Sequence, residues 1–337
     1  MPSPQVGLAL AAALLVIVVG VVRTFTAGSR KYEDGENTVG KEYDAWTEEG
    51  VLEYYWGEHI HLGYYDEQDR RGMFWPPKKN FIEAKFDFVD KMFEWGWKGD
   101  PAGPKTILDV GCGVGGTSRH LARKFPSARV VGITLSPRQA RRATELAAEQ
   151  GVANVRFEVM DALKMKWGSD QFDLVWGCES GEHMPDKAAY VNEMTRVLKP
   201  GGSLIIATWC QRDGDNFTPE EKGTLQFLYD EWAHPYFISY EEYGRIMERT
   251  GVLSEVVSAD WVKETINSWR HSIWVGVFDP WVVVFKGPRI WWKTTREIVT
   301  LERMHRAFAS GLMTYGMIRS TKASESGAKA GAARVFA

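Results

Sequence analysis

Runs of apolar residues alternate with mixed segments through the middle of the chain. Apolar runs of strand length occur at 106–110, 128–134, 155–160, 172–177 and 203–209. Segments between them have apolar residues at helical spacing, at 116–125, 137–150 and 186–198. Strands that alternate with helices in this way form a mainly parallel sheet with helices on both faces. The pattern therefore predicts an α/β fold.

The segments around this core divide the chain further. Helices are predicted at 81–97, 218–232 and 239–250, and a late strand at 252–262. The predicted order is an N-terminal membrane anchor at 1–23, a linker at 24–40, an aromatic-rich cap at 41–100, the core at 101–262 with a cap insertion at about 211–250, a basic aromatic region at 263–320, and a flexible tail at 321–337.

The N-terminal segment is strongly apolar, and Val6–Val22 contains no charged residue. A helix of this length reaches about 25 Å, which just crosses a thin hydrocarbon core. Arg23, Arg30 and Lys31 follow it, and the positive-inside rule then keeps the rest of the chain on the cytoplasmic or stromal side. The segment predicts a retained transmembrane helix. A cleaved signal peptide is the alternative, disfavoured because no basic residue precedes the apolar run.

The C-terminal stretch 281–320 mixes aromatic and aliphatic residues with basic ones. Its basic residues include Lys286, Arg289, Lys293, Arg296, Arg303 and Arg306. This composition is expected of basic amphipathic helices that lie on an anionic membrane. An amphipathic cap over a substrate pocket fits equally well, and both interpretations stay open.

Composition narrows the possible functions. A formal net charge of -3 over 337 residues gives no overall positive field, so nucleic acid is not expected as a partner. Cys112, Cys178 and Cys210 lack metal-ligand spacing and are expected to be free thiols, and no metal site is predicted. The 15 tryptophans, many of them outside the glycine-rich region, indicate a large apolar ligand or a membrane surface. No feature identifies a protein partner.

The stretch GPKTILDVGCGVGGTSRHLARKF runs from a strand through a glycine cluster into a helix, which brings backbone N–H groups close to a ligand. A Walker loop is excluded because no Gly-Lys-Ser/Thr follows. Gly111, Gly113 and Gly116 formally fit the dinucleotide pattern G-x-G-x-x-G. However, Asp109 ends the strand, where a carboxylate repels a pyrophosphate and attracts a cation. A cationic ligand is therefore expected.

The stretch Asp109-Val110-Gly111-Cys112-Gly113-Val114-Gly115 resembles the signature E/D-x-G-x-G-x-G of S-adenosylmethionine-dependent methyltransferases. The resemblance implies a Rossmann-like class I fold with a mainly parallel seven-stranded sheet and a helical substrate-binding cap. It implies S-adenosyl-L-methionine as the cofactor. It also places Asp109, Gly111, Cys112, Gly113 and Gly115 at that cofactor.

Downstream segments carry the same resemblance. Asp161 and Ala162 follow the third strand, where this class meets the adenine amino group, and Glu179 lies in FDLVWGCESGEHM at the fourth strand. LKPGGSL is similar to the turn before the fifth strand. One departure concerns the ribose, because ITLSPRQ replaces the acid that many members have after the second strand. The cofactor residues implied here are Thr134, Leu135, Ser136 and Gln139.

Segments outside the core narrow the resemblance. YDAWTEEGVLEYYWGEHIHLGYY at 43–65, SGEHMPDK at 180–187, and the TWCQRD and HPYF segments resemble the cyanobacterial and algal 2-methyl-6-phytyl-1,4-benzoquinol methyltransferases of tocopherol and plastoquinone synthesis. Gamma-tocopherol methyltransferases and other sterol or small-molecule methyltransferases are the alternatives, and a nicotinamide-dependent oxidoreductase is the alternative from another class. The resemblance implies a lipophilic prenylquinol substrate, membrane lipid as a partner, and a plastid or cyanobacterial membrane as the location.

Methylation of an aromatic carbon requires electron density there, which ionising the neighbouring hydroxyl supplies. Candidate bases are His59 and His61, together with Glu182 and His183 after the fourth strand, at the edge where such sheets bind substrate. A purely structural role is the alternative for each. The resemblance also places Tyr43 near the cofactor, where an aromatic face attracts a sulfonium.

Overall fold

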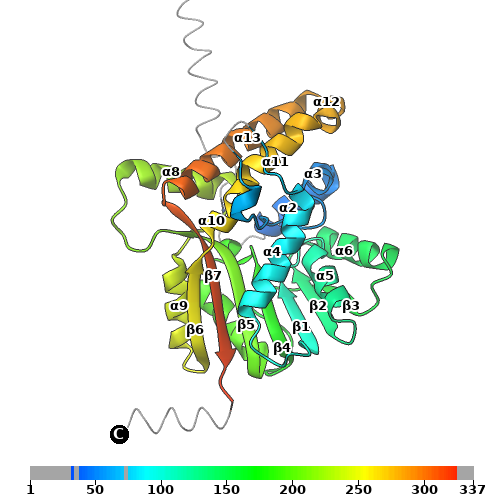
Figure 1. Ribbon diagram of the computed structural model, residues 1–337, viewed down its shortest axis with the longest axis vertical. Helices are drawn as coiled ribbons and strands as arrows, with labels where there is room; N and C mark the ends of the chain where they lie inside the picture. Colours follow the sequence, from blue (N-terminus) through cyan, green and yellow to red (C-terminus); the bar gives the residue numbers. More distant parts are fainter. Residues whose placement is uncertain (1–31, 34–37, 72–74, 325–337) are drawn as a thin grey trace, which may run out of the picture.

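The computed structural model describes residues 32–33, 38–71 and 75–324, which build a seven-stranded sheet with helices on both faces (Figure 1). The strand order is β3-β2-β1-β4-β5-β7-β6. The strands are β1 (Thr106–Val110), β2 (Arg129–Thr134), β3 (Val155–Val159), β4 (Phe172–Cys178), β5 (Leu198–Gln211), β6 (Leu253–Asp260) and β7 (Met313–Lys322).

The first five strands run parallel, with β1 paired to β2 and β4, β2 to β3, and β4 to β5. β7 lies antiparallel between β5 and β6. The predicted Rossmann-like, mainly parallel seven-stranded sheet is therefore confirmed for the described residues, with a mixed edge formed by β7 and β6.

Two helical layers cover the sheet. One face is covered by α4 (Phe81–Gly96), α5 (Gly116–Lys124) and α6 (Pro137–Glu149). Right-handed crossovers from β1 to β2 and from β2 to β3 place α5 and α6 on the same side, and α4 packs beside α5. α7 (Lys187–Val197) and α9 (Tyr240–Arg249) lie on the other face. The central strands β1, β2, β4 and β5 are largely buried between these layers, so their apolar runs are nearly continuous, whereas the edge strands β3 and β6 are mostly half-buried or exposed.

Side-chain caps explain where several helices begin. The Asn80 side chain accepts hydrogen bonds from Ile82 N and Glu83 N at the start of α4, and Ser136 accepts one from Gln139 N at the start of α6. Such caps satisfy backbone donors that have no partner within the helix.

A third layer lies over the carboxyl edge of the parallel strands (Figure 1). α2 packs on α6, α3 packs on α11, and α13 packs on α8. Its helices are α2 (Thr38–Glu49), α3 (Val51–Trp56), α8 (Pro219–Glu231), α10 (Val262–Thr265), α11 (Asn267–Phe278), α12 (Trp281–Lys286) and α13 (Pro288–Ala309), and short 3-10 turns are formed by η1 (Glu67–Asp69) and η2 (Gly181–His183). Segments from both ends of the described chain thus build the cap.

The helical interpretation of 281–320 is wrong for its last part. α13 ends at Ala309, Gly311 adopts a φ of 74°, and the chain then enters β7. β7 pairs along both edges, with β5 and β6, and Tyr315, Met317 and Ile318 in its middle are fully buried. The glycine after α13 is the stop signal that the continuous mixture of apolar and basic residues obscured. Residues 321–322, assigned to the flexible tail, are the end of this strand.

The prediction of an N-terminal transmembrane helix, and of membrane anchoring through it, is corrected. Among the described residues no helix is long and apolar enough to cross a membrane. The longest of them, α13, carries Lys293, Arg296 and Glu297 near its middle, and such charges are costly in hydrocarbon. The predicted span, Val6–Val22, lies outside the described residues.

Candidate active site

The site lies where the direction of the strand order reverses, between β1 and β4. Connections from the carboxyl ends of these neighbouring strands leave to opposite sides, which opens a crevice between them. Two cavities occupy this crevice, one of about 450 Å³ and one of about 680 Å³. They share Tyr43, Ile60, Glu179 and His183 as wall residues, so the two cavities meet there.

The smaller cavity, called here the cofactor cavity, is lined by most of the predicted cofactor residues. They are Tyr43, Asp109, Gly111, Cys112, Gly113, Thr134, Leu135, Ser136, Gln139, Asp161, Ala162 and Glu179. Gly115 is the exception, because a Cβ there would point at Phe157, 2.5 Å from its ring, and not into the cavity. With this one exception, the predicted cofactor residues lie together in the wall of one cavity.

The glycine turn gives the cofactor cavity a backbone wall. The amides of Gly111 and Cys112 both donate to Ile133 O at 2.9 Å, which ties the turn to β2. Gly113 has a φ of 54°, and a Cβ on it would have only Gln139 Nε2 within 4 Å, at 3.9 Å. The backbone is therefore open to a ligand at this point, as the motif requires.

Asp109 is the penultimate residue of β1 and lies beneath this turn. Its carboxylate is buried, with 2% of the residue exposed, and Oδ2 accepts a hydrogen bond from Ser118 Oγ at 2.6 Å. Burial raises the pKa of Asp109 to about 6. The carboxylate is ionised at neutral pH and favours a cationic group in the cavity.

The end of β2 uses neutral groups at the cavity wall. Thr134 Oγ1 donates to Gln139 Oε1 at 2.8 Å, which holds the Gln139 amide in the wall. Ser136 Oγ bonds Asp44, whose Oδ1 also accepts from Arg138 N at 3.2 Å. A carboxylate is therefore present close to the end of β2, but it comes from α2. Sequence reasoning did not identify it because the two segments are far apart in the chain.

The larger cavity, called here the apolar cavity, lies under the cap. It is lined by Tyr55, Trp56, Trp209, Trp232, Trp269, Ile273, Val277, Val283, Trp291, Ile298 and Leu301, among others. Glu179, Glu182, His183 and His234 are polar residues of its wall. Glu49, Lys293, Thr294, Thr295 and Glu297 also line this cavity, but aromatic and aliphatic side chains make up most of its wall, which suits a largely apolar ligand.

Two buried carboxyl groups face the apolar cavity: Glu179, which lines both cavities, and Glu182, which lines the apolar cavity alone. Glu179 Oε1 accepts hydrogen bonds from Leu62 N at 2.8 Å and Tyr315 Oη at 2.7 Å. Glu182 Oε2 accepts from Thr208 Oγ1 at 2.6 Å, and Oε1 is buried without a hydrogen-bond partner among the described residues. Burial raises the pKa of both carboxyl groups. Glu179 also has a φ of 49°, a strained conformation that is typical of functional sites.

His183 lies beside these carboxyl groups. Its Nε2 is 3.0 Å from Tyr43 Oη, and its Nδ1 is buried without a partner among the described residues. Its ring stacks on His234, with centroids 4.4 Å apart. Burial lowers the pKa of His183 to about 3, so the imidazole is neutral. Donation from the Tyr43 hydroxyl to Nε2 leaves the ring proton on Nδ1, which can then donate to a ligand.

His59 and His61 lie in the wall of the cofactor cavity, and neither is among the described residues that line the apolar cavity. His61 Nδ1 is 2.8 Å from Leu62 O and its Nε2 is 3.1 Å from His59 Nδ1. The carbonyl only accepts, so His61 Nδ1 carries the proton and His59 donates to His61. Burial lowers the pKa of both, that of His61 to about 3. This pair is placed to support the loop after α3.

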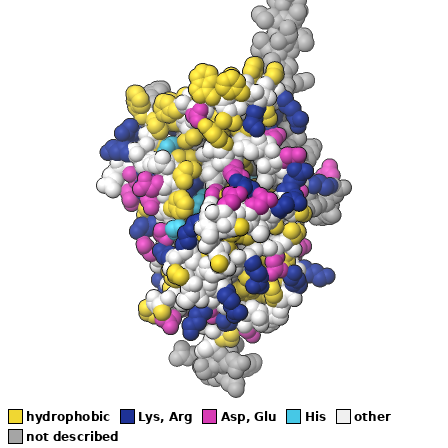
Figure 2. All heavy atoms as spheres, turned by 90° about the vertical axis from the view of Figure 1, so that its right-hand side faces the viewer, with side chains coloured by type: hydrophobic (Ala, Val, Ile, Leu, Met, Phe, Trp, Pro, Cys, Tyr) yellow, Lys and Arg dark blue, Asp and Glu magenta, His cyan; other side chains and the backbone are white. Residues whose placement is uncertain are grey.

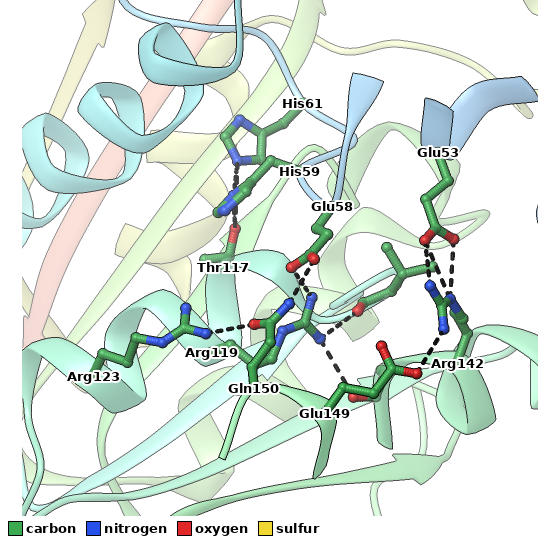
Figure 3. A network of polar contacts seen from close by, with 12 residues as sticks. Glu53, Glu58, His59, His61, Thr117, Arg119, Arg123, Arg142, Glu149 and Gln150 are labelled. Carbon is green, nitrogen blue, oxygen red and sulfur yellow. Dashed lines mark hydrogen bonds and ion pairs between the residues drawn. The ribbon is translucent and has the colours of Figure 1, made fainter. Parts of the chain in front are cut away.

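Two ion pairs hold the same loop and α3 against the core (Figure 3). Glu58 Oε2 accepts from the fully buried Arg119 at 2.6 Å, and Glu53 pairs with Arg142 of α6 at 2.7 Å. Both residues of the cap are thereby fixed to helices that follow the strands of the cofactor cavity.

Several residues of the site were missed from the sequence. Trp209, Trp232, Trp269 and His234 form an aromatic cluster in the wall of the apolar cavity, with the Trp209 and Trp269 rings 5.1 Å apart. The high tryptophan content indicated a large apolar ligand but not which residues meet. A histidine within the apolar run around HPYF was the available signal for His234.

Comparisons with known proteins agree with this geometry. Residues 107–202 match the family model described as a methyltransferase domain. The chain is 42% identical to the 2-methyl-6-phytyl-1,4-hydroquinone methyltransferase of Synechocystis, over 87% of this chain and 90% of that protein. It is 35% identical to the chloroplastic tocopherol O-methyltransferase of Arabidopsis thaliana, over 81% and 79%. Among solved structures, the geranyl diphosphate C-methyltransferase of Streptomyces coelicolor has a TM-score of 0.62 at 19% identity and covers 84% of this chain and 96% of that one.

The fold and the matched domain define a class I S-adenosylmethionine-dependent methyltransferase. Within that class, the chain belongs to the family that contains the Synechocystis phytylhydroquinone methyltransferase and the plant tocopherol methyltransferases.

Proposed function

We propose that the protein methylates a ring carbon of a prenylated hydroquinone, 2-methyl-6-phytyl-1,4-benzoquinol, in tocopherol and plastoquinone synthesis. The supporting observation is that a polar cofactor cavity and a large aromatic cavity meet at Glu179 and His183. The substrate of the Synechocystis methyltransferase, which is 42% identical to this chain, supports this choice. The prenyl chain would occupy the aromatic cavity and the quinol ring would lie at its polar end.

The cofactor cavity suits S-adenosylmethionine, which supplies an electrophilic methyl group carried on a positively charged sulfur. Asp109 would attract the positive charge of this ligand, and Gly113 would let its amino-acid end approach the backbone. Gln139 and Asp161 would hold the ribose and the adenine, as the resemblance implies. Tyr43, shared by both cavities, would separate the cofactor from solvent at the point of transfer.

We infer that Glu182 is the general base. Its unpaired Oε1 lies in the wall of the apolar cavity and accepts the proton of a ring hydroxyl, which raises electron density at the neighbouring carbon. His183 donates from Nδ1 to the ring oxygen and fixes the orientation of the ring. One methyl group replaces one ring hydrogen, so one proton leaves the site for each turnover. His59 and His61 would support the loop after α3 and take no part in proton transfer.

A tocopherol is the second candidate substrate, because the plant tocopherol methyltransferases also match over most of the chain. Membrane lipid would be the medium in which either prenylated substrate is met. The deciding experiment offers the purified protein labelled S-adenosylmethionine with phytylbenzoquinol or with gamma-tocopherol in lipid. We expect faster transfer to the benzoquinol; preference for the tocopherol would reassign the substrate, and transfer to neither would refute a prenylquinol function.

A further inference from the structure

A continuous set of large apolar side chains is exposed on the outer side of the cap. Phe278 is 63% exposed at the end of α11, and Trp281 and Phe285 on α12 are 60% and 82% exposed. We call the whole set the α12 patch, and it consists of Val277, Phe278, Trp281, Val284, Phe285, Trp291, Trp292 and Ile298. Figure 2 shows hydrophobic side chains gathered at this end of the molecule. Clusters of large, exposed apolar side chains mark interaction sites.

The α12 patch is continuous with the apolar cavity. Val277, Val284, Trp291 and Ile298 belong to the patch and also line the cavity. The same helices therefore present one side to the cavity and the other to the surroundings. A prenylated ligand that left the cavity between α11, α12 and α13 would pass over the patch.

Basic side chains border the patch. Lys286 at the end of α12 and Arg289 at the start of α13 are both exposed. Lys286 Nζ donates to Glu49 O at 2.6 Å, the Glu49 carboxylate pairs with Lys293 at 2.5 Å, and Asp279, the acidic residue next to Phe278, accepts a hydrogen bond from Tyr54 at 2.5 Å. Tryptophans with flanking cations suit the interface of an anionic bilayer, where indole rings prefer the headgroup level. A second protein chain would need no such positive border.

We propose that the α12 patch docks on an anionic lipid bilayer, so that the apolar cavity opens directly into the membrane. The proposal rests on the proposed function, because a bilayer is where a prenylquinol is found. It involves only the surface of the cap and no membrane-spanning segment. Docking by this face brings the substrate to the active site without passage through water.

The test uses the full chain with a single reporter. The three native cysteines are buried, so Phe285→Cys can be labelled selectively with an environment-sensitive dye. Val257→Cys, an exposed apolar position on the edge strand β6, is the matched control. On addition of vesicles of equal parts phosphatidylcholine and phosphatidylglycerol, we expect a blue shift and quenching by nitroxide lipids at position 285 and no change at 257. The protein should bind vesicles of phosphatidylcholine alone at least about fivefold more weakly.

Other occupants of the patch give different signals. A shift at position 285 that grows with protein concentration without vesicles would indicate a second copy of the chain. A shift present before vesicles are added, at every protein concentration, would indicate that another segment of this chain covers the patch. Each result would overturn the proposal, as would equal responses at 285 and 257.

A second variant links docking to turnover. Phe285→Ser should reduce methyl transfer to phytylbenzoquinol in vesicles about tenfold, because a buried phenylalanine contributes strongly to partition into lipid. Transfer to a short-chain, water-soluble methylbenzoquinol should be unchanged, and Val257→Ser should change neither rate. Methylation of no quinol with the vesicle signal intact would contradict the proposed function alone. Normal transfer from vesicles by Phe285→Ser would contradict the docking proposal alone.

Discussion

The role of Glu182 can be tested by Glu182→Gln, which keeps the shape of the side chain and removes its charge. The residue is 1% exposed and its Oε1 has no partner among the described residues, so the change should disturb the packing very little. A positioned general base contributes about 100- to 10,000-fold to the rate, and we expect kcat to fall within that range. Cofactor affinity should stay the same because Glu182 is not among the residues of the cofactor cavity.

The pH dependence gives a sharper test than the rate alone. Burial raises the pKa of Glu182, so kcat/KM of the unchanged protein should rise with pH through a limb well above about 4.3, the ordinary value for glutamate. Thr208→Val removes the hydrogen bond that lowers this pKa and should move the limb to higher pH. Glu182→Gln should abolish the limb. Glu248→Gln, an exposed change on α9, is the control and should leave the profile unchanged.

Glu182→Gln should lower the activity of the protein but raise its stability at alkaline pH. A carboxyl whose pKa is raised on folding binds its proton more tightly in the folded state, so ionising it destabilises the fold as pH rises from the unfolded value through the folded one. Glu182→Gln should therefore have a higher Tm than the unchanged protein at alkaline pH, and a smaller difference at pH 4. An unchanged rate and pH limb in Glu182→Gln, measured with labelled cofactor, would refute the assignment of the base.

Three further changes test the cofactor cavity and the cap. Asp109→Asn should raise the Kd for S-adenosylmethionine about tenfold, as measured by calorimetry. In the unchanged protein the affinity should fall below pH 6, because protonation removes the Asp109 charge as pH falls through its pKa of about 6. The affinity of the Asp109→Asn variant should not change over this range. Gly111→Ala should destabilise the fold by more than Gly151→Ala in denaturant titrations. Both glycines have a positive φ, which costs an alanine about 1–2 kcal/mol. The new Cβ at 111 would in addition lie 2.3 Å from Ser180 Cβ, whereas a Cβ at 151 meets nothing within 4 Å. Glu58→Gln should cost about 1–2 kcal/mol of unfolding free energy, less than a fully buried pair because Glu58 is 32% exposed, and Glu67→Gln should cost nothing measurable.

The parts of the fold that local pattern specifies were predictable. The run at 106–110, its glycine turn and the helix from 116 were read almost to the residue, because strand length, positive-φ glycines and helical spacing are local signals. β7 was not, since it pairs on both sides with strands, β5 and β6, that lie far from it in the chain. Its antiparallel insertion between β5 and β6 has no local signal.

The same difference between local signals and tertiary contacts applies to the residues of the site. Residues that follow a strand, such as Asp109, Asp161 and Glu182, could be placed because the carboxyl ends of parallel strands converge at one edge of the sheet. His59 and His61 looked equally suitable as bases, but their mutual hydrogen bond and their place in the cofactor wall are tertiary features. The contact between Tyr43 and His183, 140 residues apart, likewise appears only in the fold.

In the proposed reaction this methyltransferase acts on the ring of a prenylated quinol. The most direct test is mass spectrometry of the product formed from phytylbenzoquinol in lipid vesicles and S-adenosylmethionine labelled in its methyl group. We predict a single labelled methyl on a ring carbon. The double variant Asp109→Asn/Glu182→Gln should form no labelled product. A label on oxygen, or on no quinol at all, would contradict the account.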